Sequence, residues 1–138
     1  MIYLIGYLTA LATFLVLDVA WLSVTIPRFY RPALGDMLAP HFSLVPAIVF
    51  YLLYPLGLLI FAIKPAFKSG SIVTAIIYGA LFGFFADATR DLSNLAILRS
   101  WSLQTTIIDL LQASVLSAAV AAVGFWVATH LKPLPAAN

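Results

Sequence analysis

The sequence predicts an all-α integral membrane protein, a single domain (1–138) built as a polytopic bundle of four transmembrane helices. Of its 138 residues, 64% are hydrophobic and only 9% are charged, whereas soluble domains are about 45–50% apolar and about 25% charged. The mean hydropathy is +1.09. A soluble chain of this length could not bury so much apolar surface, because small domains bury only part of their surface. We therefore expect the lipid bilayer to be its solvent.

Four apolar stretches each come close to the ~20 residues that cross a bilayer as a helix. The first ends before Pro27, and Ser43 is placed to cap the second, with Pro46 in its first turn, where proline is tolerated. The turn signal Lys68-Ser69-Gly70 precedes the third, and Pro133 follows the fourth. The helices are expected at residues 2–26, 44–63, 71–92 and 103–130.

An even number of spans places both termini on one side of the membrane. Tryptophan favours the membrane–water interface, where arginine can also contact lipid headgroups. We expect five interface anchors: Trp21, Arg28, Arg31, Trp101 and Trp126. The chain has no cysteine, which excludes disulfides and cysteine metal sites. Its net charge of +2 is too small to predict a nucleic-acid partner.

Polar residues occur on all four predicted helices at a similar depth. With a rise of about 1.5 Å per residue, Asp18 lies roughly 12 Å before the end of the first helix, and Asp87 roughly 10 Å before Asn94. Asp109 lies roughly 10 Å into the fourth helix, and two tyrosines lie roughly 10–15 Å into the second. These helix ends share one side of the membrane, so the sequence predicts one intramembrane polar cluster. Its members are Asp18, Tyr51, Tyr54, Asp87, Arg90, Asp91, Asn94, Asp109 and Gln112.

Two rows of small residues lead into the acidic residues. Residues four apart share a helix face, and small residues let membrane helices approach closely. The rows are Gly79, Gly83, Asp87 and Asp91 on the third helix, and Asp109, Ala113, Ser117 and Ala121 on the fourth. We expect the glycines, the alanines and Ser117 to form a packing seam that directs the carboxylates into the bundle. The same small residues would also permit a dimer contact.

Charges inside a bilayer are costly, and they usually face the interior in pairs. Asp87 and Arg90 are three residues apart on one helix, so we expect a local, charge-neutral pair with a mainly structural role. Asp91 is expected to share a site with Asp18 and Asp109. These three carboxylates could serve either as hydrogen-bonding links between helices or as a functional site.

The segments that carry a family resemblance are "LDVAWL" (17–22), "FYRPALGDML" (29–38), "AIVFYLLYPLG" (47–57), "GALFGFFADATRDLSNLA" (79–96), Trp101 and "IIDL" (107–110). In this order they resemble a bacterial family of predicted membrane proteins, domain of unknown function 2177. The resemblance covers nearly the whole chain and implies a four-helix protein of the bacterial inner membrane, with no established activity. The family pattern usually has tyrosines at positions 87 and 90 and Trp-Gly at 112 and 113, so this chain resembles a divergent member.

Three classes of function agree with the sequence. The first, which we favour, is a non-enzymatic accessory or assembly subunit of a larger membrane complex, such as an electron-transport or light-harvesting assembly, or of a homo-oligomer. The second is a proton- or cation-linked carrier or binder of a small amphipathic ligand that uses the carboxylate cluster. The third is an intramembrane enzyme acting on a lipid, with paired carboxylates as acid and base.

No signature of catalytic or cofactor chemistry occurs in the predicted spans. They contain no nucleophile elbow, no H-E-x-x-H metal motif and no phosphate-binding glycine loop. The two histidines, His41 and His130, are far apart in the chain. We therefore predict no catalytic residue, no metal and no cofactor, and expect at most a bound lipid or other hydrophobic ligand.

Overall fold

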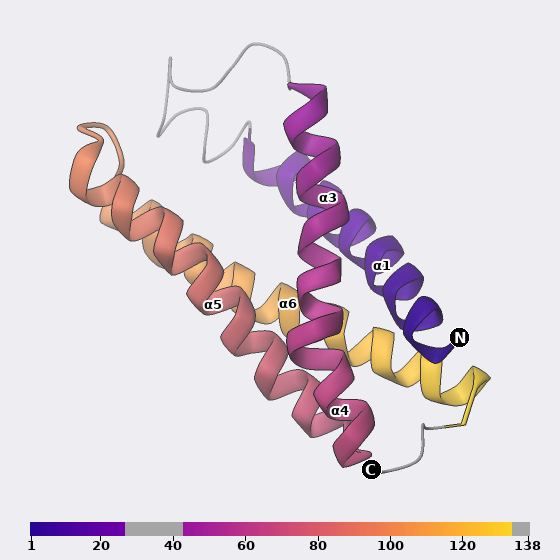
Figure 1. Ribbon diagram of the computed structural model, residues 1–138. Coiled ribbons are helices and arrows are strands. Elements are labelled where there is room, and N and C mark those ends of the chain that lie inside the picture. The colour runs from indigo at the N-terminus through magenta and orange to yellow at the C-terminus, as the bar shows by residue number, and fades with distance from the viewer. Residues whose placement is uncertain (27–42, 134–138) are drawn as a thin grey trace.

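The computed structural model describes residues 1–26 and 43–133, and it confirms the all-α prediction of four membrane-spanning helices. In chain order the described elements are α1 (Ile2–Thr25), α3 (Leu44–Leu58), the π-helix η3 (Leu59–Ile63), α4 (Lys64–Ser69), α5 (Ile72–Ile97) and α6 (Leu103–Leu131). Each of the four spans is long and apolar enough to cross a bilayer, and α3, η3 and α4 together form the second. The spans form a bundle in which α5 and α6 run side by side (Figure 1).

The second span continues to Ser69 instead of ending at Ile63 as the sequence predicted. Pro65 lies at the start of α4, directly after the π-helical turn η3, so the span passes through the proline without ending. Lys64 keeps its ammonium 5.8 Å from the centre of the Tyr3 ring. The span ends at Gly70, whose φ of 68° is the left-handed conformation that terminates many helices.

The third span also continues beyond its predicted end, to Ile97. The polar residues after position 92 do not end the helix, and the Ser93 hydroxyl donates to the carbonyl of Thr89 at 2.7 Å. Ser71 caps the start of α5 by accepting from the N–H of Val73, and Ser102 caps the start of α6 by accepting from the N–H of Thr105.

Glycines on α5 allow α6 to approach closely. A Cβ added at Gly79 would lie 2.7 Å from the carbonyl oxygen of Ser117, and one at Gly83 would collide with the carbonyl oxygen of Ala113. The two rows of small residues therefore face each other within one chain. They are enclosed between α5 and α6, so they do not provide a contact between copies.

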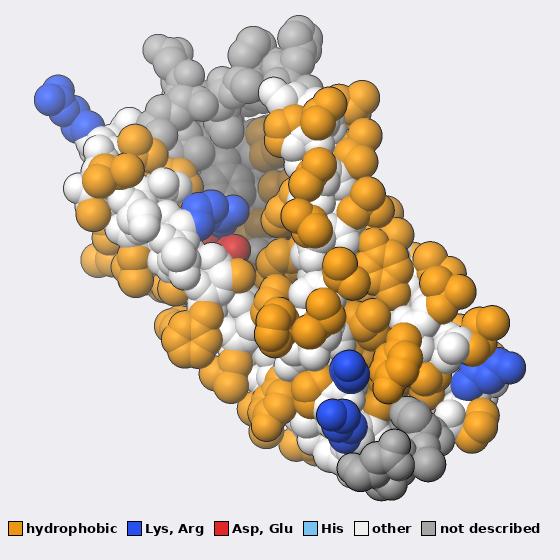
Figure 2. All heavy atoms as spheres, in the orientation of Figure 1, with side chains coloured by type: hydrophobic (Ala, Val, Ile, Leu, Met, Phe, Trp, Pro, Cys, Tyr) orange, Lys and Arg blue, Asp and Glu red, His pale blue; other side chains and the backbone are white. Residues whose placement is uncertain are grey.

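The start of α1 and the end of α6 lie at the same end of the bundle (Figure 1). There the ring of Phe67 on α4 packs 5.9 Å from Tyr3 and 5.7 Å from Phe125. At the opposite end α3 diverges from α5, and within α3 only Pro55 and Leu58 are buried. The visible surface is covered largely by hydrophobic side chains, as lipid contact requires, but basic and acidic atoms appear between α3 and α5 (Figure 2).

Candidate functional site

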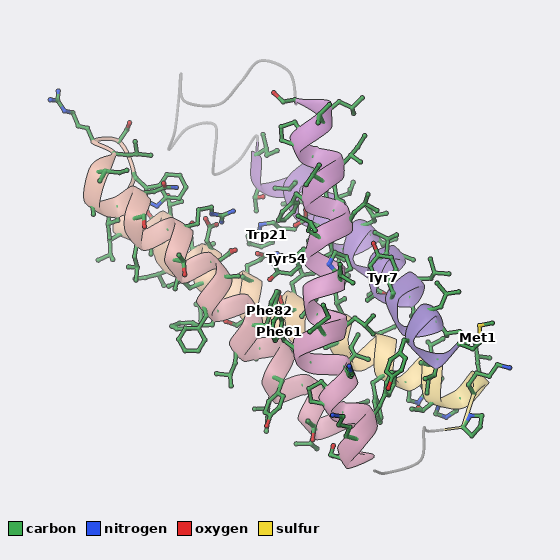
Figure 3. All side chains as sticks on the ribbon, in the orientation of Figure 1. Met1, Tyr7, Trp21, Tyr54, Phe61 and Phe82 are labelled. Atoms are coloured by element: carbon green, nitrogen blue, oxygen red, sulfur yellow. The ribbon has the colours of Figure 1, made fainter. Side chains whose placement is uncertain are left out.

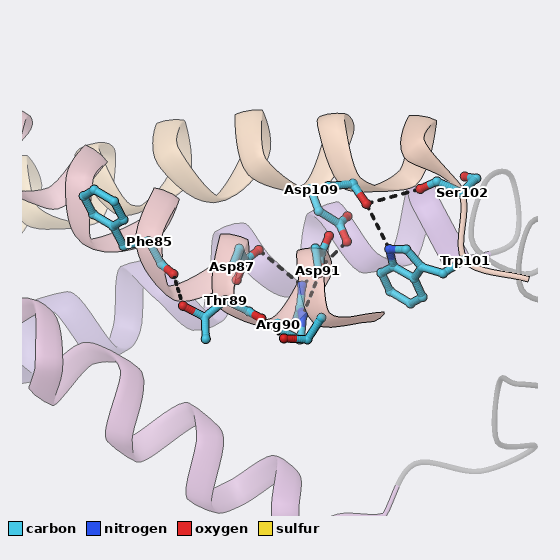
Figure 4. A network of polar contacts seen from close by, with 10 residues as sticks. Phe85, Asp87, Thr89, Arg90, Asp91, Trp101, Ser102 and Asp109 are labelled. Carbon is cyan, nitrogen blue, oxygen red and sulfur yellow. Dashed lines mark hydrogen bonds and ion pairs between the residues drawn. The ribbon is translucent and has the colours of Figure 1, made fainter. Parts of the chain in front are cut away.

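Arg90 on α5 contacts three carboxylates at the diverging end of the bundle (Figure 4). Its Nε donates to Oδ1 of Asp91 at 2.9 Å, and its Nη2 donates to Oδ2 of Asp87 at 3.2 Å. The same Nη2 lies 3.6 Å from Oδ2 of Asp109 on α6. The guanidinium thus joins α5 to α6 beyond the end of the glycine seam.

The expected pair of Asp87 and Arg90 is therefore only one part of a larger network. The shortest of the three contacts goes to Asp91, the next residue in sequence. Neighbouring residues normally point away from each other on a helix, so the sequence pattern did not predict this contact. Asp91 is fully buried, and its Oδ2 has no hydrogen-bond partner among the described residues.

Two tyrosines tie the sparsely packed helix α3 to its neighbours. The Tyr51 hydroxyl donates to Oδ2 of Asp18 on α1 at 2.8 Å. The Tyr54 hydroxyl lies 2.6 Å from Oγ of Ser117 on α6. Both bonds cross between spans, so they fix the position of the α3 segment that faces the acidic residues.

A cavity of about 440 Å³ opens between these helices. Its polar lining residues are Asp18, Tyr54, Asp87, Arg90, Asn94, Asp109 and Gln112, and its other lining residues are Phe14, Trp21, Leu22, Ile26, Phe50, Trp101, Ala113 and Leu116. Trp21 and Tyr54 lie in the space between α1, α3 and α5 (Figure 3). Of the predicted polar cluster, Tyr51 and Asp91 do not line the cavity, but each bonds to a residue that does.

The predicted interface anchors occupy different environments. Trp21 and Trp101 line the cavity, and Trp101 Nε1 donates to Oγ1 of Thr106 at 3.1 Å. Trp126 is 54% exposed on the outer surface, and its ring lies 4.2 Å from that of His130. Arg28 and Arg31 lie outside the described residues.

Sequence reasoning did not single out the aromatic side of the cavity. Phe14 stacks on Tyr54 with ring centroids 4.8 Å apart, and it also packs against Phe50 at 5.7 Å. Phe14 precedes Asp18 by four residues and therefore shares its helix face. That spacing could have indicated that Phe14 lies near the acidic residues. Its apolar character alone does not distinguish Phe14 from the other residues of an apolar helix.

Among the described residues, no group of three or more His, Cys, Asp or Glu side chains is arranged to hold a metal ion. Arg90 occupies the centre of the carboxylate group instead. The site therefore offers two chemical surfaces, one of charged oxygens around a guanidinium and one of aromatic rings. A molecule with both a polar and an apolar part would match them.

We expect Tyr51→Phe to lower the free energy of unfolding by about 1 kcal/mol, because it removes the bond to Asp18 that crosses from α3 to α1. Unfolding of the purified protein by titration with sodium dodecyl sulfate measures the change. The matched control is Tyr78→Phe, since Tyr78 is 46% exposed on the outer face and should change stability by less than about 0.5 kcal/mol. Equal losses in the two variants would contradict this role for Tyr51.

Comparison with known families identifies one match. The family model DUF2177, described as a predicted membrane protein, matches residues 3–126. Comparison with curated proteins and with solved structures yields no match. Because the family model covers most of the chain and the four apolar helices agree with its description, the chain belongs to the predicted membrane protein family DUF2177.

Proposed function

We propose that this membrane protein binds a small amphipathic molecule in the cavity between α1, α3, α5 and α6, as a binder or carrier. The cavity itself supports this proposal most strongly. Its volume of about 440 Å³ lies within the range of about 300–1,000 Å³ that is common for ligand pockets. A subunit whose only role was to pack against other membrane proteins would not need a polar cavity among its own helices.

The lining suggests how such a molecule would be held. Asp18, Asp87, Arg90 and Asp109 would take its polar end, while Phe14 and Phe50 would take its apolar end. The polar groups come from three different helices. Rigid helices position binding groups more precisely than loops do. The ligand would therefore be recognised by a constellation that depends on the assembled bundle.

The accessory subunit favoured by the sequence is our second candidate. The short α4–α5 and α5–α6 connections and the broad apolar surface support it, since both suit packing against other membrane proteins. Copurification distinguishes the two candidates. Gentle extraction followed by mass spectrometry should give the protein with a small bound molecule for a binder, and stoichiometric partner proteins for a subunit.

The decisive experiment is native mass spectrometry of the protein released from lipid nanodiscs. We expect a stoichiometric bound molecule in the wild type and its loss in Gln112→Trp, because Gln112 lines the cavity and the indole would fill part of it. Gln104→Trp is the matched control, since Gln104 is exposed near the start of α6. A bound molecule that survives Gln112→Trp, in a variant of unchanged thermal stability, would place the ligand elsewhere and overturn the proposal.

We also propose that the protein is a multi-pass protein of the bacterial inner (cytoplasmic) membrane with both termini on the same side. The sequence contains no cysteine, so each introduced thiol is unique. Tyr3→Cys and Ala136→Cys should react with a membrane-impermeant maleimide from one face, and Arg99→Cys, in the α5–α6 connection, from the other. Labelling of positions 3 and 136 from opposite faces would contradict this topology.

A further inference from the structure

We infer that the ligand of this cavity carries a cationic head group, which binds between Asp18 and the carboxylates around Arg90. The inference rests on the proposed function, because it names the chemical class of the ligand for the same cavity. It follows from the charges of the lining, the bonding of Asp18 and the aromatic side chains opposite.

The charges of the site are strongly unequal. Three carboxylates line the cavity, on Asp18, Asp87 and Asp109, against one cationic side chain among the described lining residues, Arg90. Arg90 also contacts Asp91, which lies behind the lining. One guanidinium therefore serves three carboxylates, and an oxygen of Asp91 is buried without a hydrogen-bond partner among the described residues. The described side chains of the site therefore include more negatively charged than positively charged groups.

The environment of Asp18 favours a cationic ligand. Its side chain accepts one bond from the neutral hydroxyl of Tyr51, and it forms no ion pair with any described residue. Asp18 is only 9% exposed, and it lines the cavity. A carboxylate inside a membrane protein is costly unless a positive charge approaches it. The cavity is the side from which a ligand can bring that charge.

The aromatic lining favours the same sign of charge. Phe14, Trp21, Phe50, Tyr54 and Trp101 all line the cavity. Aromatic faces attract organic cations, most strongly those of tryptophan, and cages of such rings recognise quaternary ammonium groups. An anionic head group would instead meet three carboxylates for one guanidinium that is already shared. An uncharged molecule would bring no counter-charge to Asp18.

Three probes of similar size separate these alternatives: phenyltrimethylammonium is a permanent cation, tert-butylbenzene is its uncharged carbon analogue, and benzenesulfonate is an anion. The full-length protein is placed in nanodiscs of zwitterionic phosphatidylcholine. The background change Trp126→Phe leaves Trp21 and Trp101 as the only tryptophans, and both line the cavity. Their fluorescence therefore reports binding directly. We expect a saturable response to phenyltrimethylammonium and none to the other two probes.

Removal and retention of the charge at position 18 complete the test. Asp18→Asn should weaken binding of phenyltrimethylammonium about tenfold or more, because it removes a unit charge beside the cation. Asp18→Glu should retain most of the affinity, because it keeps the negative charge. This result would show that Asp18→Asn weakens binding by removing the charge and not by disrupting the fold. Gln104→Ala is the control outside the cavity, because Gln104 is exposed near the start of α6, and it should change the affinity less than about threefold.

Equal binding of the cation and its uncharged analogue, or unchanged cation binding in Asp18→Asn, would overturn the inference and leave the proposed function standing. Preference for benzenesulfonate, or no response to any probe, would overturn it as well. The proposed function is tested separately by the molecule that native mass spectrometry finds with the protein. The two can therefore fail independently.

Discussion

Gly83→Ala is expected to lower the free energy of unfolding by about 2–3 kcal/mol, the upper part of the range of about 1–3 kcal/mol that overpacking costs. The added methyl would collide with the carbonyl oxygen and carbon of Ala113 and with Oγ of Ser117. Two of these atoms belong to the backbone of α6, so the collision can be relieved only if α5 and α6 move apart. Elsewhere in a helix, alanine is favoured over glycine by about 1 kcal/mol. Helix propensity alone would therefore predict that Gly83→Ala stabilises the protein, whereas the collision with α6 predicts that it destabilises the protein.

Gly57→Ala is the matched control for this prediction. The three atoms nearest to its added Cβ all belong to the ring of Phe82, a half-buried side chain that can turn aside. We expect a change within about 1 kcal/mol of zero for Gly57→Ala. Titration with sodium dodecyl sulfate gives both free energies. A Gly83→Ala protein as stable as Gly57→Ala would show that the seam tolerates separation and is not the main contact between α5 and α6.

The fold could be predicted from the sequence because lipid imposes a simple pattern, about 20 apolar residues for each span. Helix ends were harder, since they depend on local bonding that composition does not record. Ser93 bonds back to Thr89 and lets α5 continue, and the π-helix η3 precedes Pro65 in a span that appeared to end at Ile63. Polar residues and proline mark the end of a span only when no neighbouring group accommodates them.

The sequence predicted the depth of the site in the membrane, but it did not predict the contacts within the site. Helical rise alone places the polar groups of four spans at one level, and in the structure Asp18, Tyr54, Asp87 and Asp109 line one cavity. Side-chain direction across helices was not predictable from spacing. The contact of Arg90 with its neighbour Asp91 depends on how a long, flexible side chain bends back. The aromatic lining depends on the angle at which α3 diverges, which no residue pattern specifies.

Arg90→Met is expected to cost about 3 kcal/mol, since removing one member of a buried charge network leaves the others uncompensated. Half of the Arg90 side chain is exposed, at 53%, so we expect the lower end of the range of about 3–5 kcal/mol seen for buried pairs. Free energies of unfolding from titration with sodium dodecyl sulfate measure the loss. Arg99→Met is the matched control, because Arg99 is exposed and outside the network, and it should change stability by less than about 0.5 kcal/mol.

Two double variants then identify the partner that matters most to Arg90. Asp91 is fully buried and lies 2.9 Å from the guanidinium, whereas Asp87 is 17% exposed and lies 3.2 Å away. Adding Asp91→Asn to Arg90→Met removes the buried charge that the first change leaves behind. We therefore expect a coupling of about 2 kcal/mol for Arg90 with Asp91, and less than about 1 kcal/mol for Arg90 with Asp87→Asn. A larger coupling with Asp87 than with Asp91 would instead support the local Asp87–Arg90 pair that the three-residue spacing predicted. Additive losses in both double variants would mean that Arg90 stabilises the bundle chiefly through Asp109 on α6.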